Sequence, residues 1–353
     1  MKRIVLCCDG TWNRADQEHN GVPIPSNVVR MAFRVAHSDG HMPQIICYDQ
    51  GVGTGNIIDR LTGGAFGDGL EENIYDAYRF LIANFEADDE LFIFGFSRGA
   101  FTARSLGGLI RKCGILKRAS VSRYREAIAL YRNDQRPDEP NPTKFREAHS
   151  VTGLDPIPIH FMGVWDTVGS LGIPLRGLRW LTRRQHQFHD TELSKAIRNG
   201  YHALAVDERR GPFEPTLWTH KPKPGQHVEQ VWFCGAHSDV GGGYVERGLA
   251  DVALEWMIEK ATGAGLALHE EAVRAYPLDP KPTGALHNSK RGFYVLTPGL
   301  DRPIGVGRSL SGDVTSDPDP TQRVHPSVRE RWEADPGYRP PELVKYYERH
   351  PTP

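Results

Sequence analysis

The segment GFSRG at residues 95–99 restricts the possible folds of this 353-residue chain more than any other part of the sequence. It ends an apolar run at 91–96 and precedes a helix-like pattern at 100–111. A G-x-S-x-G pentapeptide between a buried strand and a helix is typical of a nucleophile elbow, a tight turn that lifts a serine above a parallel sheet. The two glycines leave room for the strand and the helix to cross. We therefore predict that Ser97 is a nucleophile held in a strained turn.

Short apolar runs alternate with helical patterns along much of the chain. Most of these runs lack apolar–polar alternation, which favours strands covered on both faces. The predicted strands are 4–8, 44–48, 91–96, 159–165, 230–234 and 293–296. Apolar residues at helical spacing predict helices at 69–85, 100–111 and 250–261. This order predicts the α/β class, with an α/β-hydrolase-like three-layer sandwich around a mostly parallel sheet.

Two segments and the tail interrupt the alternation of strands and helices. We expect 117–150 and 170–224 to be helical insertions over the carboxyl edge of the sheet, where they would form a lid or cap. The tail at 299–353 is rich in Pro, Asp and Arg, and we expect it to wrap the surface irregularly. Neither insertion looks like an independent domain, so we predict a single domain over 1–353, and no internal repeat is present.

The composition excludes several classes of protein. With 39% hydrophobic and 25% charged residues, the chain can form a large core. A formal net charge of -1 gives no basic footprint for nucleic acid, and no apolar run approaches the roughly 20 residues of a transmembrane helix. The N-terminal apolar run is too short for a signal peptide, which predicts a cytoplasmic protein and leaves export by a dedicated secretion system open. The odd number of cysteines, five, indicates reduced thiols and no zinc site.

A nucleophilic serine needs a histidine as base and an acid to orient it. In chain order, the next predicted strand ends at Asp166 and a later one ends just before His237. Parallel strands bring their carboxyl ends to one edge, so Ser97, Asp166 and His237 form the preferred triad. An alternative triad in the same chain order uses Asp239 as the acid and His325 as the base.

Backbone N–H groups near Ser97 would stabilise a developing oxyanion. The N–H of Arg98 lies at the predicted helix N-terminus, and a second donor is expected near Gly10 or Thr11, after the first strand. We expect Asp9 to hold that loop by accepting its N–H groups. The residues expected to line the site are Asp9, Trp12, Gly53, Gly95, Phe96 and Gly99.

With these residues in place, the chain resembles the catalytic domain of type VI secretion phospholipase effectors and their bacterial and fungal relatives. The resemblance implies an α/β-hydrolase fold and a Ser-Asp-His triad that cleaves acyl esters of phospholipids. It places that triad on Ser97, Asp166 and His237. The matching pieces are CDGTWN (8–13), YDQGVGTG (48–55), GFSRGAFTAR (95–104), VWDTVGSLG (164–172), HALAVDERR with F and PTLW (202–218), and HSDVGGGY (237–244).

The sequence thus predicts a serine esterase of phospholipase or lipase type that needs no metal and no organic cofactor. The alternatives are a short-chain carboxylesterase, thioesterase or carbohydrate deacylase on the same fold, and a non-catalytic binding scaffold. The segment 175–186 combines four arginines with Trp180 and three leucines, a composition suited to peripheral contact with a membrane surface. An Arg-rich helix that packs its Leu face on the core would have the same composition. The oligomeric state is left open.

Overall fold

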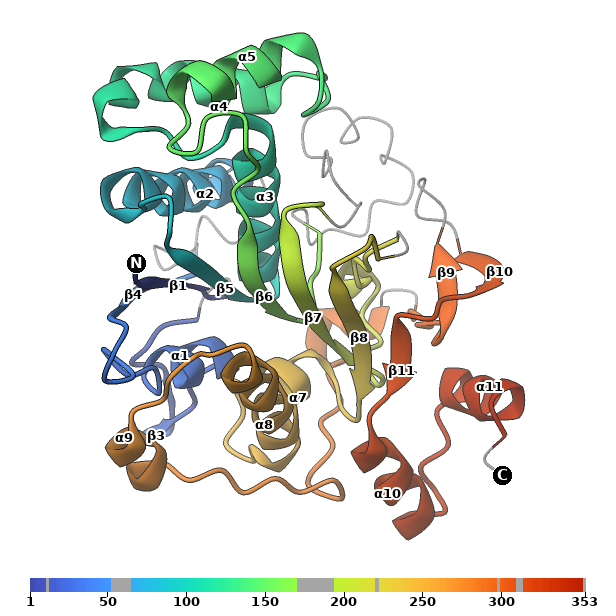
Figure 1. The fold of residues 1–353 in the computed structure, drawn as a ribbon. Helices are drawn as coiled ribbons and strands as arrows, with labels where there is room; N and C mark the ends of the chain where they lie inside the picture. Colours follow the sequence, from blue (N-terminus) through green and yellow to red (C-terminus); the bar gives the residue numbers. More distant parts are fainter. Residues whose placement is uncertain are drawn as a thin grey trace.

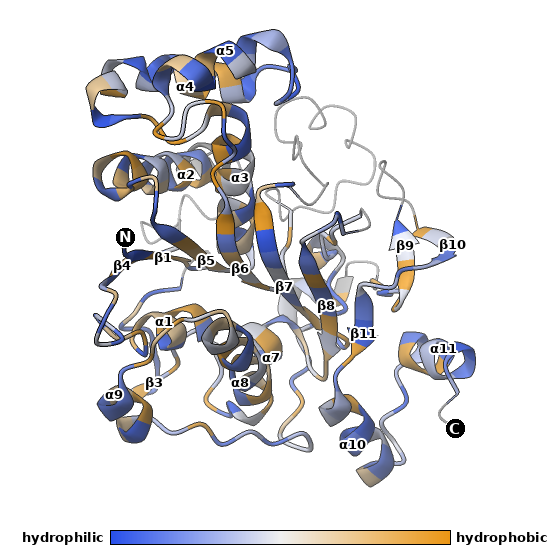
Figure 2. Ribbon diagram, in the orientation of Figure 1, coloured by the Kyte–Doolittle hydropathy of each residue, from blue (hydrophilic) through white to orange (hydrophobic). Residues whose placement is uncertain are grey.

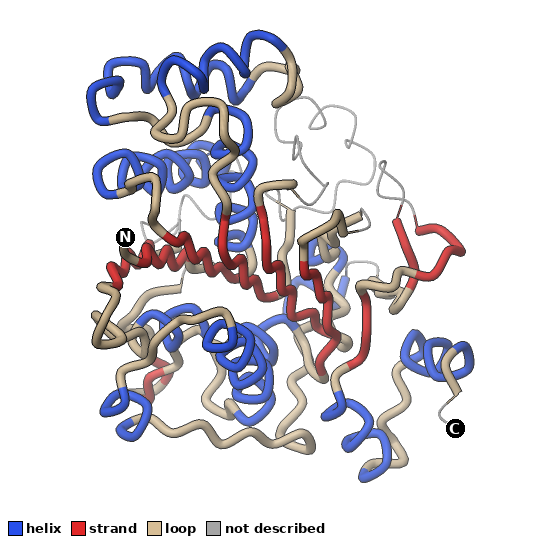
Figure 3. Tube along the Cα trace, in the orientation of Figure 1, coloured by secondary structure: helices blue, strands red, loops and turns tan. Residues whose placement is uncertain are grey.

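A parallel sheet forms the centre of the protein (Figures 1 and 3). The computed structural model describes residues 1–10, 13–51, 65–169, 194–219, 222–296, 299–308 and 314–351. Within these residues the sheet has seven strands: β1 (Arg3–Cys8), β4 (Gln44–Asp49), β5 (Glu90–Phe96), β6 (Ile159–Trp165), β7 (Ile197–Ala205), β8 (His227–Phe233) and β11 (Gln322–Val324). Their spatial order is β11-β8-β7-β6-β5-β1-β4, and every neighbouring pair is parallel.

Helices cover both faces of this sheet, which makes three layers (Figure 1). One face carries α2 (Ala65–Asn84) and α3 (Arg98–Cys113), and the other carries α1 (Asn27–Ala32) and α8 (Gly248–Gly263). The remaining helices are α4 (Tyr124–Arg132), α5 (Pro140–His149), α7 (His237–Gly241), α9 (Glu270–Ala275), α10 (Pro326–Ala334) and α11 (Pro341–Arg349), with 3-10 turns η2 (Arg118–Arg123), η3 (Gly211–Phe213) and η4 (Gly292–Leu296). Two short hairpins pair β2 (Glu18–His19) with β3 (Val22–Pro23), and β9 (Val306–Arg308) with β10 (Val314–Pro318). The predicted fold class is confirmed.

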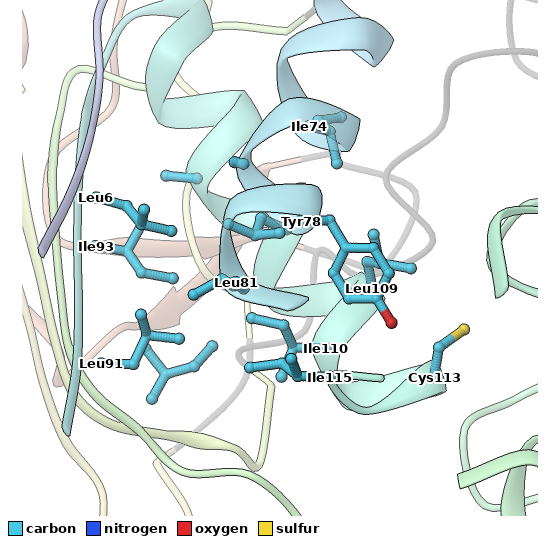
Figure 4. Packing of buried hydrophobic residues seen from close by; sticks show 14 of the residues in the cluster. Leu6, Ile74, Tyr78, Leu81, Leu91, Ile93, Leu109, Ile110, Cys113 and Ile115 are labelled. Carbon is cyan, nitrogen blue, oxygen red and sulfur yellow. The ribbon is translucent and has the colours of Figure 1, made fainter. Parts of the chain in front are cut away.

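The sheet separates two buried apolar clusters, one under each helical layer. On the α2–α3 face, Leu6 and Ile93 of the strands pack against Tyr78 and Leu81 of α2 and Leu109 of α3 (Figure 4). On the opposite face, strand aromatic residues pack against α1 and α8. Because the central strands bury side chains on both faces, they lack apolar–polar alternation, as the sequence indicated.

Register brings the carboxyl ends of the strands to one edge. Gly95 of β5 pairs with Cys8 of β1, and Phe96 pairs with Trp165 of β6. Trp165 in turn pairs with Ala203 of β7. The loops after β1, β5, β6 and β8 therefore all leave the sheet along this edge, where sites of parallel sheets form.

Five of the predicted strands are confirmed, and one is wrong. The run at 293–296 belongs to the 3-10 turn η4, where Val295 is 60% exposed, so its apolar residues do not mark a buried strand. Two strands of the central sheet were missed. β7 is interrupted by polar residues and Gly200, and β11 is only three residues long, so neither produces a continuous apolar run.

The expected insertions are also corrected. Segment 117–150 packs on α3 near Cys113, whose Sγ contacts Ala127 O, at the end of the helix far from Ser97. It therefore extends the helical layer and does not cover the carboxyl edge (Figure 1). Segment 170–224 includes β7, a central strand of the sheet, and its residues 170–193 lie outside the described residues.

The tail is more regular than expected. It supplies the edge strand β11 and the helices α10 and α11, which mix hydrophobic and hydrophilic residues in the manner of surface helices (Figure 2). Val328 of α10 and Leu343 of α11 are fully buried in a third cluster with Trp232 of β8. The tail thus completes one end of the core.

Candidate active site

Ser97 sits at the turn between β5 and α3, at the carboxyl edge of the sheet. Its φ of 58° and ψ of -119° are strained for a residue with a side chain. The Ser97 N–H donates a hydrogen bond to Trp165 O at 3.0 Å, which joins the turn to the end of β6. Such strain at a strand-to-helix turn is what a nucleophile elbow requires.

The glycines on either side allow this turn to exist. A Cβ at Gly95 would lie 2.6 Å from Gly99 O, and a Cβ at Gly99 would lie 2.2 Å from Cys8 O. Both distances are far below van der Waals contact, and both involve backbone atoms that cannot move aside cheaply. The pentapeptide therefore has glycine at these two positions because β1, β5 and α3 cross in direct contact.

Asp166 and His237 form a buried pair at the same edge. Asp166 follows β6, and His237 is the first residue of α7, after β8. His237 Nδ1 lies 2.6 Å from Asp166 Oδ2, and the two residues are 4% and 0% exposed. The φ of Asp166 is also positive, at 37°, so its backbone is strained like that of Ser97.

Asp166 is ionised in this environment. Burial by itself raises the pKa of the carboxyl, but the Arg302 guanidinium and His237 outweigh burial and hold the pKa below its ordinary value. Arg302 donates to both carboxylate oxygens, at 2.7 Å to Oδ1 and 3.1 Å to Oδ2. The N–H of Ala205 donates to Oδ1 at 3.0 Å. A carboxylate without a proton can only accept, so Nδ1–H of His237 is the donor.

The His237 ring is held neutral and in one orientation. Burial lowers the pKa of His237 against the opposing attraction of Asp166. The ring lies against Phe96 and Phe213, with centroids at 4.6 Å and 4.8 Å. Because Nδ1 carries the proton, Nε2 is an acceptor, and a neutral imidazole in this tautomer can take a proton from a hydroxyl.

Glu208 anchors the backbone of the histidine. Its carboxylate accepts from the His237 N–H at 3.2 Å and from Ser289 Oγ at 2.8 Å. Burial opposes its charge, but the fork of Arg210 brings the pKa of Glu208 down to about 2. Glu208 and Arg302 were not singled out from the sequence. Glu208 lies in the HALAVDERR piece, whereas nothing in the tail sequence marks Arg302.

The loop after β1 differs from the expectation in one respect. The Gly10 N–H, an expected oxyanion donor, donates to Asp9 Oδ1 at 2.7 Å and is therefore hydrogen-bonded within its own loop. Asp9 also accepts from Ser26 Oγ at 2.7 Å and Tyr48 OH at 2.8 Å, and it holds the ends of β1 and β4 together. The candidates Thr11, Trp12 and Gly53 and the segment 175–186 lie outside the described residues.

The alternative acid and base are not brought together. Asp239 accepts from His287 Nδ1 at 2.6 Å and from the Ala236 N–H at 2.9 Å. His325 caps α10 through Ser327 and follows β11, which lies four strand positions from β5, about 19 Å at the usual spacing. Asp239 therefore fixes the loop that carries His287, and His325 ends the edge strand.

The N-terminus of α3 lies directly behind the serine. Arg98 is the first residue of this helix, so its N–H is at the positive end of the helix dipole. Among the described residues, no group of three or more His, Cys, Asp or Glu side chains is arranged to hold a metal ion. The described helices also include none of the length and apolarity needed to cross a membrane.

A parallel sheet with a strained serine turn after a central strand defines an α/β-hydrolase-like protein. Residues 2–260 match the family described as "T6SS, Phospholipase effector Tle1-like, catalytic domain". The chain belongs to this family.

Three similar proteins differ in how much of the chain they cover. The uncharacterized protein YEL023C of Saccharomyces cerevisiae is 29% identical over 241 residues, which are 63% of this chain and 33% of that protein. An uncharacterized protein from Pseudomonas aeruginosa aligns with a TM-score of 0.44 at 20% identity, over 76% of this chain and 46% of its own. The Tle1 effector bound to the VgrG spike of the type 6 secretion system aligns with a TM-score of 0.39 at 20% identity, over 69% of this chain and 51% of its own.

Proposed function

We propose that the protein is a serine hydrolase that cleaves acyl esters of phospholipids through Ser97, His237 and Asp166. The observation that carries the proposal is the buried contact of 2.6 Å between His237 Nδ1 and Asp166 Oδ2, at the edge where the strained turn presents Ser97. The family supports a lipid substrate, since its description names phospholipase effectors. The N–H bond from Ser97 to Trp165 O ties the nucleophile to the residue that precedes the acid.

The proposed reaction has two steps. Ser97 Oγ attacks the acyl carbonyl while His237 Nε2 takes the hydroxyl proton, and the N–H of Arg98 stabilises the oxyanion. Collapse of the tetrahedral intermediate breaks the ester bond, and His237 returns the proton to the departing alcohol. Water then attacks the acyl-enzyme, with His237 again as the base, and releases the fatty acid and Ser97. Asp166 keeps its negative charge throughout and stabilises the imidazolium.

A fluorophosphonate probe and a lipid panel test this proposal together. We expect the probe to label wild-type protein at Ser97, as located by peptide mass spectrometry, and not to label Ser97→Ala. We also expect hydrolysis of phospholipid vesicles to exceed hydrolysis of soluble p-nitrophenyl esters. A folded Ser97→Ala protein with full esterase activity would refute the nucleophile. Faster turnover of short soluble esters, without a rise above the micellar threshold, would favour a short-chain esterase instead.

The midpoint of the acid limb of the pH profile should lie below the ordinary pKa of histidine. Proton transfer needs neutral His237, so activity is lost as pH falls through the pKa of this group. Burial lowers that pKa from 6.5, and we therefore expect near-constant kcat/KM from neutral pH down to a midpoint below 6.5. The measurement is kcat/KM, or the rate constant of fluorophosphonate labelling, from pH 4 upward. A midpoint above 7 would show that Asp166 dominates over burial.

A further inference from the structure

Arg302 donates hydrogen bonds to both carboxylate oxygens of the acid of the proposed triad. It is 2% exposed, and its two terminal nitrogens donate to the two oxygens of Asp166 at 2.7 Å and 3.1 Å. The same nitrogens also donate to Ala205 O, at 2.8 Å, and to Phe213 O. The guanidinium therefore links Asp166 to the end of β7 and to the turn whose aromatic ring lies on His237.

The position of Arg302 in the chain is as notable as its contacts. It lies 136 residues after Asp166 and outside residues 2–260, which match the family. It reaches the site because the tail returns along the carboxyl edge before β9, with Leu300 N–H bonded to Arg209 O at 2.9 Å. The tail, which the sequence predicted to wrap the surface, thus contributes a buried side chain to the site.

We propose that Arg302 is a positioning residue that completes the triad, by clamping Asp166 in the orientation that His237 needs and by balancing its charge. This inference rests on the proposed function. The clamp acts through geometry, because two parallel hydrogen bonds fix the carboxylate plane and direct Oδ2 at Nδ1. It also acts through charge, because a buried positive group beside the carboxylate weakens the hold of Asp166 on an imidazolium proton.

The other charged groups around the pair do not replace Arg302. His237 faces Asp166 on one side, with Glu208 and Arg210 acting on it from the β7 loop. The ring of His202, on β7, is kept neutral by burial and by Arg104, with its pKa near 3. The Glu208 carboxylate is itself matched by the Arg210 fork. Within the part of the chain that the structure describes, loss of Arg302 would therefore leave Asp166 with no cation bonded to it except a protonated His237.

The test is the pH dependence of fluorophosphonate labelling at Ser97, which needs no knowledge of the natural lipid. In Arg302→Gln we expect the acid limb to move up by about one pH unit, because the pair now binds its proton more tightly. Relative to the plateau rate of each protein, labelling well below the midpoint should then be about ten-fold slower in Arg302→Gln than in wild type. In Arg302→Lys the positive charge remains, so we expect the midpoint of the acid limb to stay at its wild-type pH. A single ammonium group cannot make the two parallel hydrogen bonds of a guanidinium, so we expect the plateau rate of labelling to be about ten-fold lower.

Arg30→Gln is the matched control. Arg30 is also a buried arginine, 6% exposed, and it pairs with the fully buried Asp251 at 2.5 Å between α1 and α8. Its loss should reduce stability to thermal unfolding without moving the acid limb. A folded Arg302→Gln with the wild-type limb would overturn the inference. If that variant does not fold, a wild-type plateau rate in Arg302→Lys would overturn it.

The two proposals can fail separately. Wild-type protein that is not labelled at Ser97 would overturn the proposed function and this inference together. Wild-type protein that is labelled normally, with Arg302 variants indistinguishable from it, would overturn the role of Arg302 alone.

Discussion

Replacing His237 with alanine should lower the rate of ester hydrolysis by about 10⁴-fold or more, with the protein still folded. Without the imidazole, Ser97 keeps its proton at neutral pH, and the departing alcohol has no acid to protonate it. The variant should retain its fold because α7 is only five residues long and the ring lies at the edge of the sheet. The measurement is kcat on the best substrate of the lipid panel, with circular dichroism as the check on folding.

His325→Ala is the control for this prediction, because His325 completes the alternative triad. Its ring stacks on Phe233, and its Nδ1 lies 2.8 Å from Ser327 Oγ, so its loss should weaken the start of α10 by about 1 kcal/mol and change kcat less than two-fold. Likewise, Asp166→Asn should cost far more activity than Asp239→Asn. The reverse pattern in both comparisons would assign the triad to Asp239 and His325.

Gly99→Ala should destabilise the protein by about 3 kcal/mol and disturb the serine turn at the same time. The added methyl group would lie 2.2 Å from Cys8 O and 2.4 Å from Asp9 O. Both atoms belong to β1 and its loop, so α3 must move away from the sheet, and Ser97 must move with it. Unfolding in urea gives the loss of stability, and fluorophosphonate labelling gives the loss of reactivity.

Gly108→Ala provides the same substitution on the same helix without the collision. Of the residues that the structure describes, its Cβ would meet only the Tyr131 side chain, with Cε2 at 3.7 Å and the hydroxyl oxygen at 3.9 Å, which is ordinary contact. Since alanine is favoured over glycine inside a helix, this variant should be more stable than wild type by about 0.5 kcal/mol. Equal stability of the two variants would contradict the prediction, because it would mean that β1 can move aside for the methyl group at little cost.

Most of the sheet could be predicted from short-range patterns. Strands β1, β4, β5, β6 and β8 each contain a short contiguous run of apolar residues, and such runs are visible in the sequence. The strand β7 was missed although it is central, since polar residues interrupt it, and the run at 293–296 was misassigned because four apolar residues do not distinguish a strand from a 3-10 turn.

The same limit applies to the site. The position of Ser97 follows from local residues, because the elbow is a contiguous strand, turn and helix. The occupied N–H of Gly10 could not be foreseen, since it depends on the way the Asp9 side chain folds back on its own loop. Two acids and two histidines also satisfied the chain order equally well.

The sequence alone determined that a serine would stand at a strained turn of an α/β fold, because glycine spacing and apolar runs act over a few residues. The tertiary structure decided which acid meets which histidine, since Asp166 and His237 are 71 residues apart in the chain and come together only through strand order. It also decided that Arg302, in an unremarkable tail, reaches the centre of the site. A contact between residues far apart in the sequence leaves no periodic pattern in it, because such a contact depends on how distant segments pack and not on the preferences of neighbouring residues.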